Sequence, residues 1–313
     1  MKNLELTDLI WAANNGNEDA KIDLGRMYYF GININKNEEK GLQLLNECIN
    51  NNNINAILVL ASIYINENRF TDAIPILEKG CNLDNGESHY LMFNILNELG
   101  DSNCIKYLDK AVLLNFEPAC YTKAGLESDL GKKYELLLKA PHVIEAKYEL
   151  GHLYLQDEFQ NYKEALKIFK ECAKAGIDGA NMYLAKIYLF GLGVDVNMNE
   201  ASKYTKIAAN KGYKDAYFNL ANMYLHGDGV KQSYKDAFYY FKLASSNKDI
   251  NATHNLACLY YSGKGCKKNI KEAIRLFEYC GKNGNKQSYE ALVEIYSNTN
   301  PELALYYKEL LND

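Results

Sequence analysis

The chain has 313 residues, of which 48% are apolar, so it is long enough for two compact domains or one elongated array. Its net charge of −5 provides no broad basic field for nucleic acid or anionic lipid, which argues against a nucleic-acid-binding protein. Asn, Lys, Ile and Tyr are all abundant, and we interpret this as the coding bias of an AT-rich genome.

The N-terminal segment carries Glu5 and Asp8 where a signal peptide would need an apolar core. No apolar run approaches the roughly 18 residues of a membrane span. We therefore expect a cytoplasmic protein without a membrane span, provided that no leader precedes this sequence. The 8 cysteines fit that compartment, because they lack the close pairing of a disulfide framework.

The first predicted element is a capping helix from Leu4 to Asn14, followed by Gly16. After it, one pattern recurs: Ala at place 1, Leu at place 5, Gly or Ala at place 6 and Tyr at place 9. Its copies begin at Ala20, Ala56, Ala146, Ala180, Ala216 and Ala252. Places 1, 5, 6 and 9 fall on one stripe of a helix, so each copy predicts an amphipathic helix.

In the later copies a Gly-x-Gly turn follows this helix, beginning at Gly191, Gly227 and Gly263. Gly suits the left-handed conformation at a helix end. A phosphate-binding loop would need a preceding strand, and none is predicted. A second apolar stripe comes after the turn. Each unit is therefore a predicted helix, turn and helix, and units must stack because neither helix can bury its stripe alone.

The pattern A-x-x-x-L-G-x-x-Y-x-x-G-x-G-V resembles the Sel-1-like repeat, a relative of the tetratricopeptide repeat, over about three quarters of the chain. The resemblance implies an all-α, right-handed superhelical solenoid of about eight to nine antiparallel helix pairs that binds another protein. Some members join helices through Cys pairs about eight residues apart. Here the second Cys is absent, so we interpret four cysteines as small buried residues: Cys48, Cys81, Cys172 and Cys280.

We predict a single repeat domain over residues 1–313. Its expected parts are an N-terminal capping helix (1–16), regular repeats (20–86), degenerate repeats without the Gly-x-Gly turn (87–141), regular repeats (145–286) and a C-terminal capping repeat (287–313). The closing helix is expected to run from Pro301 to Leu311 with Asn300 as its N-cap.

One cluster has the residue types of a metal site, namely His142, Glu145, Glu149 and His152. A helix opening at Pro141 would put all four on one face, but we interpret them as polar features of a groove. Neither a Ser/His/Asp or Cys/His signature nor a C-x-x-C pair occurs. We therefore predict no enzyme, no catalytic or metal-binding residue and no cofactor.

The resemblance places a partner on a concave wall formed by the first helix of each unit. The core stripe leaves places 3 and 7 exposed on that wall: Ile22 and Arg26, Leu58 and Ser62, Tyr148 and His152, Met182 and Lys186, Phe218 and Asn222, and His254 and Cys258. This lining mixes apolar, aromatic and polar side chains, as interface cores do, although several members would contact the next unit instead. Tyr29 and Tyr261 are also expected to be exposed.

The leading interpretation is a scaffold or adaptor that binds a protein or an extended peptide in this groove, without nucleic acid or membrane partners. One alternative is an immunity-type or inhibitory protein that neutralises one toxin or enzyme. Another is a metal-dependent enzyme built on His142 and its neighbours. The groove carries no concentrated Lys/Arg clamp, so capture of an acidic C-terminal peptide is not specifically indicated.

Overall fold

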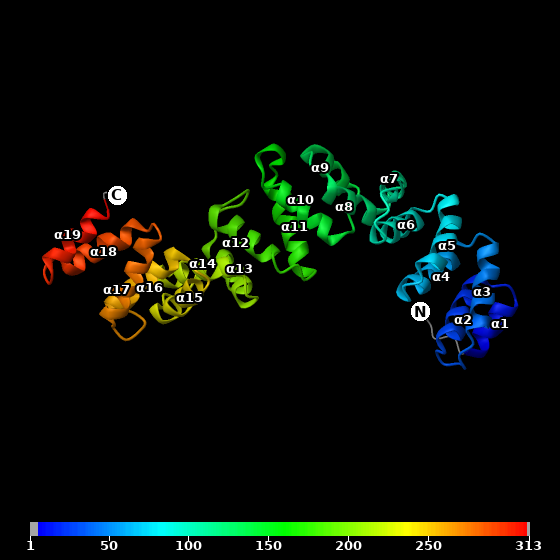
Figure 1. Ribbon diagram of the computed structural model, residues 1–313, viewed down its shortest axis with the longest axis horizontal. Coiled ribbons are helices and arrows are strands. Elements are labelled where there is room, and N and C mark those ends of the chain that lie inside the picture. Colours follow the sequence, from blue (N-terminus) through cyan, green and yellow to red (C-terminus); the bar gives the residue numbers. More distant parts are fainter. Residues whose placement is uncertain (1–5, 312–313) are drawn as a thin grey trace. The chain divides into compact units, whose positions relative to one another are not determined.

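The structure, a computed structural model, describes residues 6–311 (Figure 1). These residues form 19 α-helices and one short 3-10 helix, and no strand occurs among them. The all-α prediction is confirmed. Contacts divide the chain into two compact units that meet in sequence at Lys147 and Tyr148.

The helices of the first unit are α1 (Leu6–Asn14), α2 (Glu18–Phe30), α3 (Glu38–Asn50), α4 (Ile54–Asn66), α5 (Phe70–Asn82), α6 (Gly86–Glu98), α7 (Cys104–Leu113), α8 (Glu117–Leu126) and α9 (Leu130–Leu138). Helix α10 (Ile144–Leu153) includes the boundary. The second unit continues with η1 (Asp157–Phe159), α11 (Tyr162–Lys174), α12 (Ala180–Phe190), α13 (Met198–Asn210), α14 (Lys214–His226), α15 (Tyr234–Ser246), α16 (Ile250–Ser262), α17 (Ile270–Lys282), α18 (Lys286–Ser297) and α19 (Pro301–Glu309).

Consecutive helices pack as hairpins, for example α2 with α3, α12 with α13, and α14 with α15. One backbone hydrogen bond recurs where a hairpin closes. The N–H of the residue that caps the second helix donates to the carbonyl of the place-9 tyrosine. The pairs are Asn37 to Tyr28 and Arg69 to Tyr64 (2.8 Å each), and Asn161 to Tyr154, Asn197 to Tyr188, Ser233 to Tyr224 and Asn269 to Tyr260 (2.9 Å each). We call this bond the hairpin clasp.

The predicted stripe forms the core between the helices. In α12, Ala180 and Leu184 are fully buried at places 1 and 5, and Ala185 is buried at place 6. The place-9 tyrosines are only half-buried, so they lie at the margin of the core. Cys48, Cys172 and Cys280 are buried as predicted, whereas Cys81 is half-buried.

The Gly-x-Gly turns have the predicted left-handed backbone at both glycines. At the turn after α14, Gly227 has φ 85° and Gly229 has φ 66°. A Cβ on Gly229 would overlap the carbonyl of Met198, so the turn lies against the start of α13. The buried Ser202 hydroxyl donates to the Gly229 carbonyl at 2.7 Å, which holds the turn in place.

Several predictions concern the ends and the middle. The N-cap at Asn300 is confirmed, because its side chain accepts from the Leu303 N–H; the closing helix then ends at Glu309. Leu4 lies outside the described residues, and α1 is described from Leu6. The stretch predicted as degenerate repeats forms hairpins of the same kind, α6 with α7 and α8 with α9.

None of the helices within residues 6–311 combines the length and apolar character needed to cross a lipid bilayer.

His89 on α6 is a buried polar residue, with 8% of its surface exposed. Its ring packs near Tyr107, with centroids 5.9 Å apart. The Cys81 backbone slightly favours protonation of the His89 ring. Neither ring nitrogen, however, has a hydrogen-bond partner among the described residues. Burial, followed by the charge of Lys110, lowers the pKa of His89 below its usual value. The ring is therefore neutral in the folded protein at pH 7.

The substitution Gly229→Ala is expected to lower the free energy of unfolding by about 2 kcal/mol or more, because Ala is strained at positive φ and its Cβ meets backbone. Gly125→Ala is the matched control. Gly125 lies in α8 with nothing near its missing Cβ, and there Ala should stabilise by about 0.5–1 kcal/mol. Urea unfolding followed by circular dichroism measures both. Equal effects of the two substitutions would contradict the proposed packing of the turn.

The stability of the first unit is expected to fall below about pH 6.5 because of His89. A lowered folded-state pKa means that the unfolded chain binds the proton first. The contribution of neutral His89 to the free energy of unfolding is thus fully present above the pKa that His89 has in the unfolded chain. It is lost as pH falls through the pKa that His89 has in the folded protein. His89→Phe should flatten the pH dependence of the urea midpoint between about pH 7 and 5, while the exposed His226→Phe should leave it unchanged. An unaltered slope in His89→Phe would rule out this role.

Candidate peptide-binding site

Six of the twelve predicted groove residues line two hollows, one in each unit. The hollow in the first unit has a volume of about 400 Å³ and lies between α2 and α4. It is lined by Arg26, Leu58 and Ser62 from the predicted set, and also by Phe30, Val59, Ile63 and Asn66. We call it the α2–α4 hollow.

The hollow in the second unit has a volume of about 430 Å³, and we call it the α12 pocket. Tyr148, Met182 and Lys186 from the predicted set line it. The other lining residues are Gly179, Tyr183, Ala185, Leu189, Phe190, Thr205, Tyr213, Asp215 and Asn219. Phe190 is 62% exposed and Tyr213 is 38% exposed, so two aromatic side chains at the rim are accessible to a partner.

The inner wall of the α12 pocket is a packed aromatic cluster. Phe169, which is fully buried, stacks on Tyr183 with centroids 4.8 Å apart and an angle of 12°. Tyr148 packs edge-on against both rings, at 5.9 and 6.0 Å. His152 contacts Tyr183 at 4.1 Å. Because a core residue holds them, the pocket-lining rings are rigid, which lowers the entropy cost of binding.

Gly179 gives the Tyr148 ring its position. A Cβ on Gly179 would come within 2.6 Å of the Tyr148 hydroxyl oxygen and 3.4 Å of the Tyr213 hydroxyl oxygen. Gly179 has φ −59°, a backbone conformation that Ala adopts without strain. The glycine is therefore required by the space that the tyrosine occupies and not by the backbone.

The centre of the α12 pocket is neutral and its charges lie at the rim. Burial raises the pKa of Tyr148 to about 12 and also raises the pKa of Tyr183, so both phenols keep their protons near neutral pH. The charged side chains of the lining, Lys186 and Asp215, belong to exposed residues. This arrangement suits an apolar side chain with polar groups on either side.

The other predicted groove residues occupy varied places. Ile22 is 5% exposed and belongs to the core of the first unit, so its predicted exposure is wrong. Phe218 packs beside Phe241, with centroids 6.1 Å apart. A nitrogen of His254 is 2.8 Å from the Ser288 hydroxyl, and Cys258, which is exposed, is 3.6 Å from its other nitrogen. Asn222 is half-buried.

The possible metal cluster is not assembled. Helix α10 begins at Ile144, so His142 precedes it and does not share a helical face with the other three residues. The His142 ring nitrogen Nδ1 instead lies 2.7 Å from Glu117 Oε1. His152 is part of the aromatic cluster. Within residues 6–311, the structure brings together no group of three or more His, Cys, Asp or Glu that would hold a metal ion.

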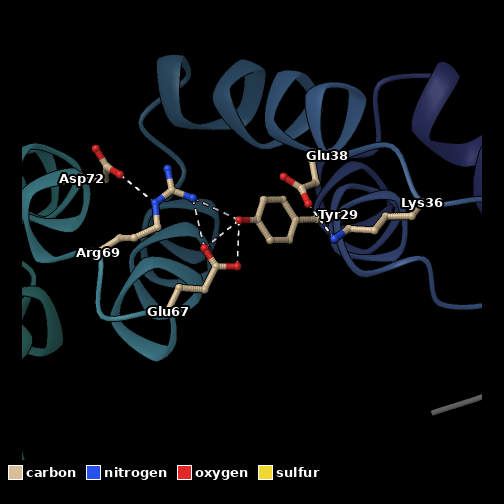
Figure 2. Close-up of polar contacts among 6 residues, drawn as sticks. All are labelled: Tyr29, Lys36, Glu38, Glu67, Arg69 and Asp72. Carbon is tan, nitrogen blue, oxygen red and sulfur yellow. Dashed lines mark hydrogen bonds and ion pairs between the residues drawn. The ribbon is translucent and has the colours of Figure 1, made fainter.

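A polar network fixes the end of α2 against the turn after α4 in the first unit (Figure 2). The Tyr29 hydroxyl lies 2.9 Å from both carboxylate oxygens of Glu67, and Arg69 Nη1 donates to Glu67 at 3.0 Å. Arg69 also pairs with Asp72 at 2.8 Å. Tyr29 is 3% exposed, so its predicted exposure is wrong, whereas Tyr261 is exposed as predicted. Burial and Glu67 raise the pKa of Tyr29 to about 12.

The Sel1 repeat matches residues 19–52, 144–177, 179–213, 214–249 and 250–285, together more than half of the chain. The chain belongs to the Sel1 repeat family. No curated protein matches it in sequence.

Solved structures give this Sel1 repeat protein the same fold. A protective antigen of uropathogenic Escherichia coli, c5321, which displays an SLR fold, is 18% identical with a TM-score of 0.76, over 99% of this chain and 72% of that chain. A Sel1 repeat protein from Oxalobacter formigenes is 23% identical with a TM-score of 0.54, over 71% of this chain and 96% of that chain. An immunity protein from Pseudomonas aeruginosa also matches, at 16% identity over 63% of this chain and 80% of that chain, but its TM-score of 0.34 is too low to indicate a shared arrangement of the repeats.

The sequence did not indicate three important residues of the α12 pocket, namely Gly179, Phe190 and Tyr213. Gly179 and Tyr213 immediately precede α12 and α14, and Phe190 is the last residue of α12. All three lie outside the nine places of the repeat pattern. Phe190 has one available signal, because it stands directly before a turn glycine, as Phe30 does, and both side chains are exposed.

The substitution Tyr29→Phe is expected to lower the free energy of unfolding by about 1–2 kcal/mol, because it removes a buried hydrogen bond to a charged group. Tyr261→Phe, at an exposed site, is the control and should change stability by less than about 0.5 kcal/mol. Urea titration of both variants tests the network. A decrease in the free energy of unfolding of Tyr29→Phe no larger than that of the control would show that the Tyr29–Glu67 hydrogen bond does not stabilise the fold.

Proposed function

We propose that this Sel1 repeat protein is a non-catalytic scaffold that binds an extended peptide segment of a partner protein in the α12 pocket. The observation that carries the proposal is the rigid aromatic wall of Tyr148 and Tyr183, which faces an accessible hollow. Aromatic anchors in a packed setting are where protein interfaces gain most of their affinity. The α2–α4 hollow, with Phe30 at its edge, offers a similar but more polar contact in the first unit.

The dimensions and chemistry of the α12 pocket suit a peptide. About 430 Å³ falls at the small end of ligand pockets and is enough for one or two side chains. Met182 and Leu189 supply apolar contact. Lys186 and Asn219 supply donors for the carbonyl groups of a bound backbone, and Asp215 supplies an acceptor for its N–H groups. The described lining includes no Cys, His or Ser.

An immunity-type or inhibitory role would be a narrower form of this proposal, in which the partner is a toxin or an enzyme. No observation in the structure favours it over general peptide binding.

Selection of random peptides displayed on phage against the full chain is expected to yield ligands with an aromatic or aliphatic anchor. Their affinity should fall at least about tenfold in Gly179→Ala, because the new Cβ displaces the Tyr148 hydroxyl from its place in the wall. Met182→Glu should have a similar effect, because it puts a charge in the apolar centre. Fluorescence anisotropy measures the binding.

Gly125→Ala provides the matched control, since it makes the same chemical change in an open helix position and should leave the affinity unchanged. Circular dichroism confirms that each variant is folded. Selected peptides that bind Gly179→Ala and Met182→Glu as tightly as the unmodified chain would overturn the assignment of the site.

A further inference from the structure

Helix α11 carries four lysines on one face. Lys163, Lys167, Lys170 and Lys174 follow one another at intervals of four, three and four residues, which is the spacing of a single helical stripe. Together with Leu166 and Glu171 they line a shallow hollow of about 390 Å³. Helix α11 carries only two carboxylates, Glu164 and Glu171, against these four lysines, which is a local basic excess in a chain with net charge −5.

The same feature recurs one repeat later. Lys203 and Lys206 on α13 stand 36 residues after Lys167 and Lys170. They line a wider hollow of about 840 Å³, with Lys231, Ile207 and Tyr224 among the other lining residues and Asp236 as its one carboxylate. Two successive Sel1 repeats in the second unit thus present lysines at equivalent places.

Tyrosine stacks connect the two hollows. Lys170 lies over the ring of Tyr188 at 5.6 Å, and Tyr188 stacks on Tyr204 with centroids 5.9 Å apart and an angle of 2°. Lys203 lies over Tyr204, the second ring of this stack, at 5.0 Å. The hollows therefore adjoin across one pair of rings, and we call the combined surface the lysine face.

The second hollow repeats the arrangement: Lys206 lies 5.5 Å from the Tyr224 ring, and Tyr224 stacks on Tyr240 at 5.8 Å and 4°. An ammonium group has three donors, so a lysine that contacts one tyrosine retains donors for a bound carboxylate. Hydrogen bonds to the tyrosine hydroxyls raise the pKa of Lys170 and Lys206, so both amines stay charged.

Internal carboxylates neutralise only part of the lysine face. Lys167 pairs with Glu164 at 3.6 Å and Lys203 pairs with Glu200 at 3.0 Å. Three more form no ion pair with any residue that the structure describes: Lys163, Lys174 and Lys231. The surface is therefore set up to receive carboxylates from outside the chain.

We propose that the lysine face is a second interaction site, which takes an extended acidic segment of a partner protein. Carboxylates spaced along such a segment would meet lysines from two successive repeats, and its apolar side chains would meet Ile207 and the tyrosine rings. The lysines of this site come from α11, from α13 and from the turn after α14, and none of them lines the α12 pocket. Its existence does not depend on the proposed function of that pocket.

The charge distribution of the whole chain favours a short acidic segment over a polyanion. Residues 1–147 contain 21 Asp and Glu against 14 Lys and Arg. A chain with net charge −5 provides no broad basic field for a long nucleic acid or an anionic membrane, whereas a segment confined to the lysine face meets mainly the local positive charge.

The test uses the full chain and a fluorescein-labelled peptide of alternating Glu and Leu residues, followed by fluorescence anisotropy. Binding should weaken as salt is added. It should weaken at least about tenfold in the double variant Lys170→Glu with Lys206→Glu. Because those lysines contact tyrosines, the variant Lys163→Glu with Lys174→Glu, at sites without ion pairs, provides a second test that does not disturb the stacks.

The matched control is Lys132→Glu with Lys267→Glu, which makes the same change in net charge at exposed lysines that line neither hollow and should alter the affinity less than about twofold. The same peptide with Gln in place of Glu should not bind. Failure of the acidic peptide to bind, equal binding by the Gln peptide, or unchanged affinity in both double variants would overturn the proposal. Tighter binding of a single-stranded oligonucleotide or of phosphatidylserine vesicles would also overturn it.

Discussion

The hairpin clasp is the contact on which the rest of this structure depends. A backbone N–H at the start of the second helix donates to the carbonyl of the place-9 tyrosine, which belongs to the last turn of the first helix or directly follows it. Carbonyls at a helix end lack partners inside the helix, so the clasp satisfies one of them and fixes where the next helix begins. The small residues at place 6 then allow the helices to pack closely. The α12 pocket and the lysine face lie on helices whose relative positions are set in this way.

Much of the fold follows from the sequence because burial at places 1, 5 and 6 is a property of helical periodicity alone. Coding bias explains the abundance of Asn, and the predicted cap at Asn300 is one of nine helix starts within residues 6–311 at which an Asn side chain accepts from the backbone, as Asn37 and Asn197 do. Asn is among the best N-cap residues, so a biased composition also serves the architecture. An Asn directly before an apolar helical pattern therefore predicts where a helix of this chain starts.

The site was less predictable, for physical reasons. Ile22 has the spacing of a wall residue, but it packs in the core with Leu45 and Ile57. Tyr29 is buried because α4 ends in a short charged turn where the later units have Gly-x-Gly, and Glu67 in this turn reaches its hydroxyl. The residues that shape the α12 pocket, such as Gly179, lie outside the repeat pattern and come together only through packing between hairpins. Periodicity specifies which side of a helix is buried, but it does not specify which neighbour a particular side chain meets.

The hairpin clasp also limits which positions of the repeat can be substituted during evolution. It is made by main-chain atoms, and its requirements on side chains are limited to a cap residue and a few small or aromatic positions. Residues such as Met182, Lys186, Lys163 and Lys174 take no part in it, so mutations there would change the two proposed binding surfaces without opening the hairpin. The first and second helices of each hairpin can therefore diverge under separate selection. One duplicated unit can thus acquire two unrelated specificities.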